Sequence, residues 1–185
     1  MNENTYPNGK IFIGQDRIGC ANYVNDLPGY PCAWSPDQLH RYALWRIFGT
    51  TIPKKIFMVV GLNPSTADEL LDDPTVRRCQ TFARREGCDA LLMTNAFSFR
   101  ATLPKDMKAY FDPIGPENDA WLRRCADISV IKIAAWGVHG KFLGRDEAVR
   151  RLIPDLQCFG LTKEGQPKHP LYLRNDTPLE AYGLP

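Results

Sequence analysis

The apolar positions of this chain gather into short runs that are separated by longer amphipathic stretches. Residues 56–60, 90–94, 130–135 and 156–159 are each mostly apolar over the length of one strand. Runs that are apolar on consecutive positions are typical of strands buried on both faces, as in a parallel sheet. We therefore predict four core strands over these ranges.

The stretch between the first two runs has the pattern of a helix that begins at Asp73-Pro74 and ends at Gly87. Asp is a favourable N-cap and Pro a favourable first helical residue. Residues 76, 79, 82 and 83 form one apolar stripe on this helix. The stripe places Phe82 in the core rather than in a binding site. Further helices are predicted near 104–110, from 116 onward, and over 145–153.

The first 54 residues are harder to interpret. Residues 1–38 contain turn-like clusters of Gly, Pro and Asn, with a short strand predicted at 10–14. The segment 35–38, Ser-Pro-Asp-Gln, has the features of a helix N-terminus and predicts a helix over 40–48. Tyr42, Leu44 and Ile47 also fit a strand, so both interpretations stay open at this point.

The alternation of strands and helices predicts the α/β class. We expect a three-layer α/β/α sandwich with a mainly parallel, four-stranded central sheet. The chain is interpreted as a single domain over residues 1–185. In it, residues 1–54 form an N-terminal extension that packs on an α/β core of residues 55–175.

Composition narrows the class of protein. Hydrophobic residues make up 44% of the 185 positions, which is enough for a core. No run of 18 apolar residues occurs and the N-terminus lacks a signal-peptide pattern, so we expect a cytoplasmic monomer without membrane contact. The net charge of +2 excludes an overall electrostatic footprint for nucleic acid, so any such binding must use a local patch.

The cysteines and histidines offer no metal site by their spacing. None of the six cysteines lies in a C-x-x-C pair, and only three histidines are present. We therefore expect neither a metal nor a cofactor. The cysteines are interpreted mostly as small buried hydrophobes.

Polar residues follow each predicted strand, where open α/β sheets bind their ligands. The four segments are Gly61–Asp68, Asn95–Ser98, Trp136–Gly140, and the region of Lys163 with residues 168–172. Each segment alone fits an ordinary turn better than a site. Four such segments at successive strand ends favour a site instead.

These segments carry two family resemblances. Gly61-Leu62-Asn63-Pro64 resembles the first motif of the uracil-DNA glycosylase superfamily in its asparagine form, and residues 91–95, 135–137 and 168–170 resemble later motifs of that superfamily. Residues 63–68, 72–75 and 160–172 resemble the bacterial and phage family named domain of unknown function 1643. The second resemblance covers nearly the whole chain, but its name implies no activity.

The superfamily resemblance implies hydrolysis of an N-glycosidic bond in DNA or in a nucleotide. Asn63 would position the attacking water with help from Asp68, which also fits a turn cap. His169 would donate a hydrogen bond to the departing base. Asn95 would read the edge of the base, since an amide offers one donor group and one acceptor. The other expected substrate contacts are Pro64, Ser65, Phe97, Trp136, Lys163, Arg77 and Arg78. In that set Phe97 would stack on the base, and the two arginines would bind phosphate unless they form a solvated face.

Two further hypotheses stay open beside the enzyme. One is a binding module that recognises a nucleotide or modified base without catalysis. The other is a transferase that modifies a base in the same pocket. The first motif continues with Ser65, and Leu171 stands where the superfamily has a Ser after His-Pro; these departures favour the module. The presence of both Asn63 and His169 favours the enzyme.

Overall fold

The computed structural model describes residues 4–5, 11–12, 32–49, 53–68 and 70–183. Two very short strands, β1 (Asn4–Thr5) and β2 (Ile11–Phe12), pair with each other apart from the main sheet; β2 falls inside the strand predicted at 10–14. The other elements, in chain order, are β3 (Cys32–Trp34), β4 (Arg41–Ile47), β5 (Ile56–Gly61), α1 (Pro74–Arg85), β6 (Ala90–Asn95), α2 (Pro104–Ala109), α3 (Asn118–Asp127), β7 (Ile131–Ala134), the 3-10 helix η1 (Val138–Gly144), α4 (Arg145–Leu152), β8 (Gln157–Cys158), the 3-10 helix η2 (Pro170–Tyr172) and β9 (Glu180–Ala181).

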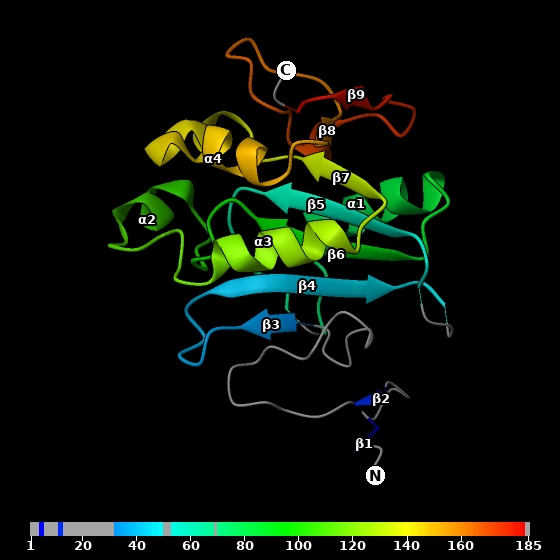
Figure 1. The fold of residues 1–185 in the computed structure, drawn as a ribbon, viewed down its shortest axis with the longest axis horizontal. Coiled ribbons are helices and arrows are strands. Elements are labelled where there is room, and N and C mark those ends of the chain that lie inside the picture. Colours follow the sequence, from blue (N-terminus) through cyan, green and yellow to red (C-terminus); the bar gives the residue numbers. More distant parts are fainter. Residues whose placement is uncertain (1–3, 6–10, 13–31, 50–52, 69, 184–185) are drawn as a thin grey trace.

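The main sheet has the strand order β3-β4-β6-β5-β7-β8-β9 (Figure 1). Strands β6, β5, β7 and β8 pair with one another in parallel. They are the four strands predicted from the apolar runs, and the α/β class is confirmed. The predicted number of strands in the sheet is wrong, because β3, β4 and β9 extend the parallel centre on both sides by antiparallel pairing.

Of the two alternatives left open for residues 40–48, the strand is the one found, since residues 41–47 form β4. Ser35 and its neighbours make the turn of a hairpin instead: Gln38 donates its N–H to the Ser35 carbonyl, and the Ser35 hydroxyl donates to Asp37 at 2.5 Å. The hairpin places β4 between β3 and β6, and the strand is buried from Arg41 to Trp45. Pairing on both sides thus overrode the local signals for a helix.

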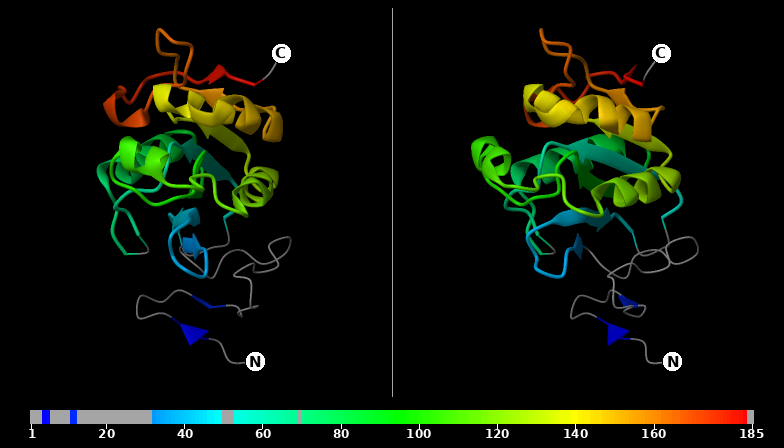
Figure 2. Two further views of the ribbon diagram at one scale, coloured as in Figure 1. Left: turned by 90° about the vertical axis from the view of Figure 1, so that its left-hand side faces the viewer. Right: turned by 60° about the vertical axis from the view of Figure 1, so that its left-hand side comes forward.

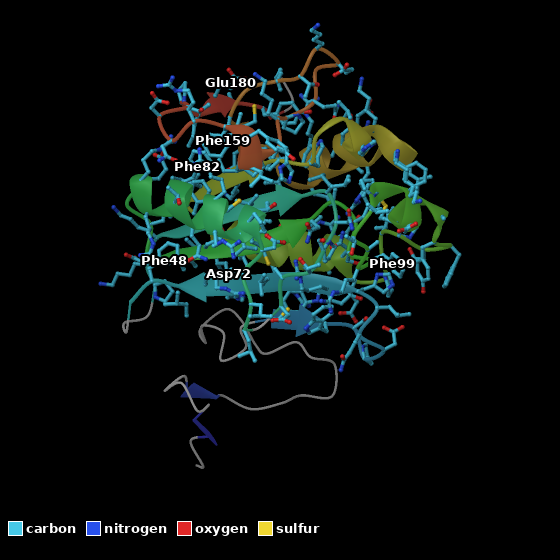
Figure 3. The ribbon with its side chains drawn as sticks, turned by 180° about the vertical axis from the view of Figure 1, so that it is seen from behind. Phe48, Asp72, Phe82, Phe99, Phe159 and Glu180 are labelled. Atoms are coloured by element: carbon cyan, nitrogen blue, oxygen red, sulfur yellow. The ribbon has the colours of Figure 1, made fainter. Side chains whose placement is uncertain are left out.

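Helix α1 follows the sequence pattern closely. Asp73 is the N-cap and its carboxylate accepts the N–H of Val76 at 2.8 Å, with Pro74 as the first helical residue. The helix buries the predicted stripe of Val76, Cys79, Phe82 and Ala83. Phe82 is fully buried against Phe159, with ring centroids 4.2 Å apart (Figure 3), so its interpretation as a core residue is confirmed.

Two apolar clusters lie on the two faces of the sheet. Successive side chains of a strand point to opposite faces, and in β5 Phe57 and Val59 pack with α1, whereas Met58 and Val60 pack with α3 and α4. We call these the α1 face and the α3 face. In the left-hand view of Figure 2 the orange segment that contains η2 lies on the side opposite α3, and η2 packs against α1.

The five cysteines of the described part are buried and free, as expected of small hydrophobes. Cys20 lies outside the described residues. No helix in the described ranges is long and apolar enough to cross a bilayer.

Candidate functional site

The sheet has one topological switch point at its carboxyl edge. The chain leaves β5 toward α1 on one face, and it leaves the neighbouring strand β7 toward α4 on the other face. Connections that diverge in this way open a crevice beyond the strand ends, where α/β proteins bind their ligands. The candidate site is therefore built from the ends of β5, β6 and β7.

Asn95 is the most informative residue at this edge. It is the last residue of β6 and, by alternation with Leu91 and Met93, it points to the α1 face. Only 4% of it is exposed, yet its side-chain amide has no hydrogen-bond partner among the described residues. The amide atoms are not among the fully buried unpartnered atoms of the described residues, so they reach the surface of the crevice, where they can bind a ligand.

Gly61 makes the room that the Asn95 amide occupies. The two residues are direct partners in the parallel pairing of β5 and β6. A Cβ added at Gly61 would lie only 2.8 Å from Oδ1 of Asn95, closer than side chains approach one another. The glycine at the start of the Gly61–Pro64 motif is thus a steric requirement of the amide.

His169 lies on the same face as Asn95. It precedes η2, which packs against α1, and Asp73 at the start of that helix is close enough to act on its charge. Burial lowers the pKa of His169 below its ordinary value, and Asp73 opposes this shift only in part. The Leu171 N–H donates to Nδ1 over 3.4 Å. A neutral ring with this contact carries its proton on Nε2 and is a hydrogen-bond donor there.

Asn63 stands at the same edge, but its amino group is already used. Its Nδ2 donates to the Pro64 carbonyl at 3.0 Å and to the Ala101 carbonyl at 2.6 Å. Pro64 is buried, and its carbonyl also accepts the Ala101 N–H. Asn63 therefore ties the loop after β5 to the loop after β6, and its Oδ1 remains as the acceptor that a water or ligand can use.

The loop from Ser65 to Asp72 is held by arginines through its main-chain carbonyls. Arg41 donates to Ala67, Arg46 to Asp68 at 2.6 Å, and Arg100 to Ser65 at 2.9 Å. Arg46 also pairs with the Asp72 carboxylate at 2.6 Å, next to β4 in Figure 3. Arg41 and Arg46 thus serve to fix this loop.

Asp68 caps a turn in this loop. Its Oδ1 accepts the N–H groups of Leu70 and Leu71 at 2.9 and 2.8 Å, and these bonds lower the pKa of its carboxyl group. The contacts match the turn-cap alternative that the sequence left open. Ser65 is half-buried in the same loop.

Phe97 and Trp136 are not placed beside Asn95. Both belong to the apolar cluster of the α3 face, and they are 0% and 2% exposed. Phe97 packs on Phe142, and the indole N–H of Trp136 donates to Gln166 at 2.9 Å. In this structure neither ring offers a free face to a ligand, so the stacking expected of Phe97 has no support in its position.

The cationic candidates are spread over the surface. Arg77 is exposed and donates to the Asp72 carbonyl, whereas Arg78 donates to the Leu173 carbonyl and to Asn175. Arg78 thereby fastens the segment after His169 to α1. Lys163 is exposed in the turn between Thr162 and Gly165. These positions bring no cluster of free cations to the end of β6.

The remaining histidines are set apart from this site. His40 is buried and its Nδ1 lies 2.9 Å from the hydroxyl of Ser98, which itself donates to the Ile114 carbonyl at 2.6 Å. Ser98 is 0% exposed, so this pair is internal to the fold rather than a nucleophile and its base. His139 is exposed next to Lys108.

Two buried polar residues that the sequence did not single out reach the end of β6 from the α3 face. They are Asn118, at the start of α3, and Arg145, at the start of α4, and both donate to main-chain carbonyls there. Polar residues in the first turn of a helix are common on protein surfaces, so their types and positions gave no signal of burial.

No metal site marks the crevice in the described part of the chain. No group of three or more His, Cys, Asp or Glu side chains is arranged there to hold an ion. A cavity of about 430 Å³ lies elsewhere, lined by Phe48, Arg84, Asp89 and their neighbours. Figure 3 shows Phe48 on the opposite side of the domain from Phe99, which follows β6.

Comparison with known proteins gives one match. A family model with the description "Protein of unknown function (DUF1643)" matches residues 41–171, which is more than half of the chain. The matched range runs from the start of β4 to Leu171 in η2, and it includes Asn63, Asn95 and His169. No curated protein and no solved structure matches the chain significantly.

Proposed function

The chain belongs to the DUF1643 family, whose description names no activity, and we propose from the site that it recognises a nucleobase and hydrolyses its N-glycosidic bond in DNA or in a nucleotide. The observation that carries the proposal is the Asn95 amide, which is 4% exposed and lacks a partner among the described residues. The planar carboxamide of Asn95 carries one carbonyl and one amino group, which match the paired donor and acceptor on a base edge.

His169 supplies the second part of the proposed chemistry. Breaking an N-glycosidic bond leaves negative charge on the departing base, and a fixed donor stabilises that charge. The lowered pKa of His169 keeps the ring neutral near pH 7, with its donor on Nε2. A neutral imidazole donates this hydrogen bond to the base without bringing a positive charge into the site. The resemblance of the Gly61–Pro64 and His169-Pro170 segments to uracil-DNA glycosylases supports the same assignment.

Asn63 would act on the water through its free Oδ1. Because an amide is not a base, its contribution is to hold the water in line with the sugar carbon rather than to remove a proton. The two bonds from its Nδ2 to carbonyls of Pro64 and Ala101 restrict the side chain and so fix the direction of that oxygen.

The same contacts favour a second candidate, a module that binds a base without cleaving it. Asp68, the carboxylate nearest to Asn63 in sequence, is bound to two N–H groups of its own turn. Both bonds use Oδ1 and lower the pKa of the carboxyl group, so Asp68 is a weak base for the water. Recognition by Asn95 is common to both candidates.

A screen of oligonucleotides separates them. Single- and double-stranded oligonucleotides with varied bases are incubated with the wild-type protein, with Asn95→Ala and with His169→Ala. Lys105→Ala, which truncates an exposed lysine on α2, is the control. Abasic sites are detected by strand scission at alkaline pH, and binding is measured by fluorescence anisotropy.

Base release by wild type and Lys105→Ala that is lost in His169→Ala supports the hydrolase. Binding without release that is lost in Asn95→Ala supports the module. The absence of both binding and release, for every oligonucleotide and for the free nucleosides, would refute recognition of a nucleobase.

A further inference from the structure

The end of β6 is held from the face opposite the candidate site. Asn118 is 0% exposed, and its Nδ2 donates to the carbonyls of Asn95 and Ala96 at 3.1 and 3.0 Å. Arg145 is 2% exposed, and its Nε donates to the same Ala96 carbonyl at 2.6 Å. Three N–H···O contacts from two helices therefore converge on two consecutive peptide groups.

These contacts act where the regular pairing of the strand ends. Up to Asn95 the strand is paired with β5, and beyond it the N–H groups of Ala96 and Phe97 bond to the carbonyls of Gly61 and Leu62. The N–H groups of this turn are thus held from β5, and its carbonyls from α3 and α4. With both sides of the main chain fixed, the direction of the Cα–Cβ bond of Asn95 is fixed too.

Packing alone does not account for an asparagine at position 118. Its Oδ1 is buried and has no hydrogen-bond partner in the described part of the chain. A leucine of similar size would fill the space and would remove this unpaired oxygen. Unpaired buried acceptors are unfavourable, and here the unpaired oxygen accompanies two donors that hold the carbonyls of Asn95 and Ala96.

Arg145 links the two helices that supply the donors. Its Nη2 lies 2.5 Å from Oδ1 of Asp119, the residue next to Asn118 on α3. A buried guanidinium needs such a partner to offset its loss of solvation. The pair fixes α4 against α3, so that the carbonyl of Ala96 receives donors from both helices at the same time.

We propose that Asn118 and Arg145 are positioning residues that hold the Asn95 amide in the orientation that discriminates among bases. The role in discrimination rests on the proposed function. The role in holding the amide stands on the contacts alone. A change at Asn118 then acts on the choice of base more than on overall affinity, because it alters the angle of one donor–acceptor pair.

The experiment compares Asn118→Leu with Thr94→Val. Thr94 is also buried, is adjacent to Asn95, and donates a hydrogen bond to a strand carbonyl, that of Val59 at 3.1 Å. Thr94→Val removes one buried hydrogen bond at nearly constant volume and leaves the carbonyls of Asn95 and Ala96 bound. Asn118→Ser, which retains one hydroxyl donor, is the second variant should Asn118→Leu fail to fold.

Two measurements are made on folded protein. The side-chain NH₂ resonances of Asn95, assigned by their loss in Asn95→Ala, are recorded without ligand by ¹⁵N NMR. Dissociation constants are then measured for a panel of four ribonucleosides and four deoxyribonucleosides, and the ratio between the two tightest is compared.

The expected result is a shift of the Asn95 resonances toward those of a freely rotating amide in Asn118→Leu, with no shift in Thr94→Val. Asn118→Leu should also lower the ratio of dissociation constants about 10-fold, the equivalent of one lost hydrogen bond. Unchanged Asn95 resonances in a folded Asn118 variant overturn the positioning role, and so does a uniform loss of affinity without a change in the ratio. If wild type binds neither a nucleoside nor any oligonucleotide, the proposed function fails, while the resonances still decide whether Asn118 holds the amide.

Discussion

Gly61→Ala tests the steric relation on which the site depends. The added Cβ would lie 2.8 Å from Oδ1 of Asn95, whereas ordinary contacts begin at 3.4 Å, so the amide must move by about 0.6 Å. The next nearest atom is the Thr94 carbonyl oxygen at 3.7 Å, an ordinary contact. The Asn95 side chain therefore absorbs nearly all of the strain.

The expected loss of stability is small. Overpacking a core costs about 1–3 kcal/mol, and the low end applies because the clashing atom belongs to a side chain. Replacing glycine also stabilises the folded state by about 0.4–1 kcal/mol through the entropy of the unfolded chain. The net change is about 1 kcal/mol or less, which shifts Tm by about 2–4 °C in a domain of this size.

The expected loss of binding free energy is larger than this loss of stability. A hydrogen-bonding group displaced by several tenths of an ångström loses its alignment, and a buried polar group left without its hydrogen bond costs about 1–3 kcal/mol. We expect the affinity for the tightest nucleoside, measured by calorimetry, to fall at least about 10-fold. Gly49→Ala is the matched control, since a Cβ there meets nothing within 4 Å.

The double variant Gly61→Ala/Asn95→Ala separates strain from recognition. Removing the amide relieves the clash, so its Tm should return toward that of Asn95→Ala, whereas binding stays lost. Wild-type affinity in a folded Gly61→Ala protein would refute the reasoning, because the amide would then have moved without consequence for the ligand.

Four further outcomes are expected. His169→Ala should lower turnover by about 10²–10³-fold in an assay of base release, because it removes the donor to the departing base. Burial lowers the pKa of His169 below 6.5, so the stability that its neutral form contributes is complete above pH 6.5 and is lost as the pH falls through the folded-state pKa. The free energy of unfolding, measured in urea, should therefore differ less between pH 7.5 and pH 5 in His169→Asn than in the wild type. Asn63→Ala should increase hydrogen exchange at the Ala101 amide, since one of the bonds joining the two loops is lost. Phe82→Ala should cost about 3–5 kcal/mol in urea unfolding, because the side chain is fully buried.

The parallel centre of the sheet was predictable because its strands are buried on both faces. Such strands appear in the sequence as continuous apolar runs, and their alternation with capped helices along the chain predicted the α/β class. Strand β4 was not predictable in the same way. Its buried stretch includes Arg41, whose guanidinium donates to the carbonyl of Ala67, 26 residues later in the chain. A long-range contact of this kind leaves no local pattern.

The residues of the site were predictable to different degrees. Asn95 follows a regular strand, so its position at the carboxyl edge could be expected. Phe97 lies two residues beyond the end of β6, where the main chain turns and strict alternation no longer gives the face. Trp136 follows β7 in the same way and also packs on the α3 face. Asn118 and Arg145 were missed because their role depends on how α3 and α4 pack on the sheet.

The place of β4 in the sheet has a consequence for how the chain is made. The β4 strand precedes β5 in sequence but pairs with β6, so that Leu44 meets Met93, a residue synthesised about 50 positions later. The unit β5–α1–β6 can form from segments that are neighbours in the sequence. The hairpin of β3 and β4 is synthesised before its partner strand β6, and until β6 emerges from the ribosome Tyr42 and Trp45 remain exposed to solvent. Closing this long loop is entropically slow. Co-translational folding of the domain is therefore gated by the emergence of β6, and the N-terminal hairpin is the segment that most needs protection from aggregation until then.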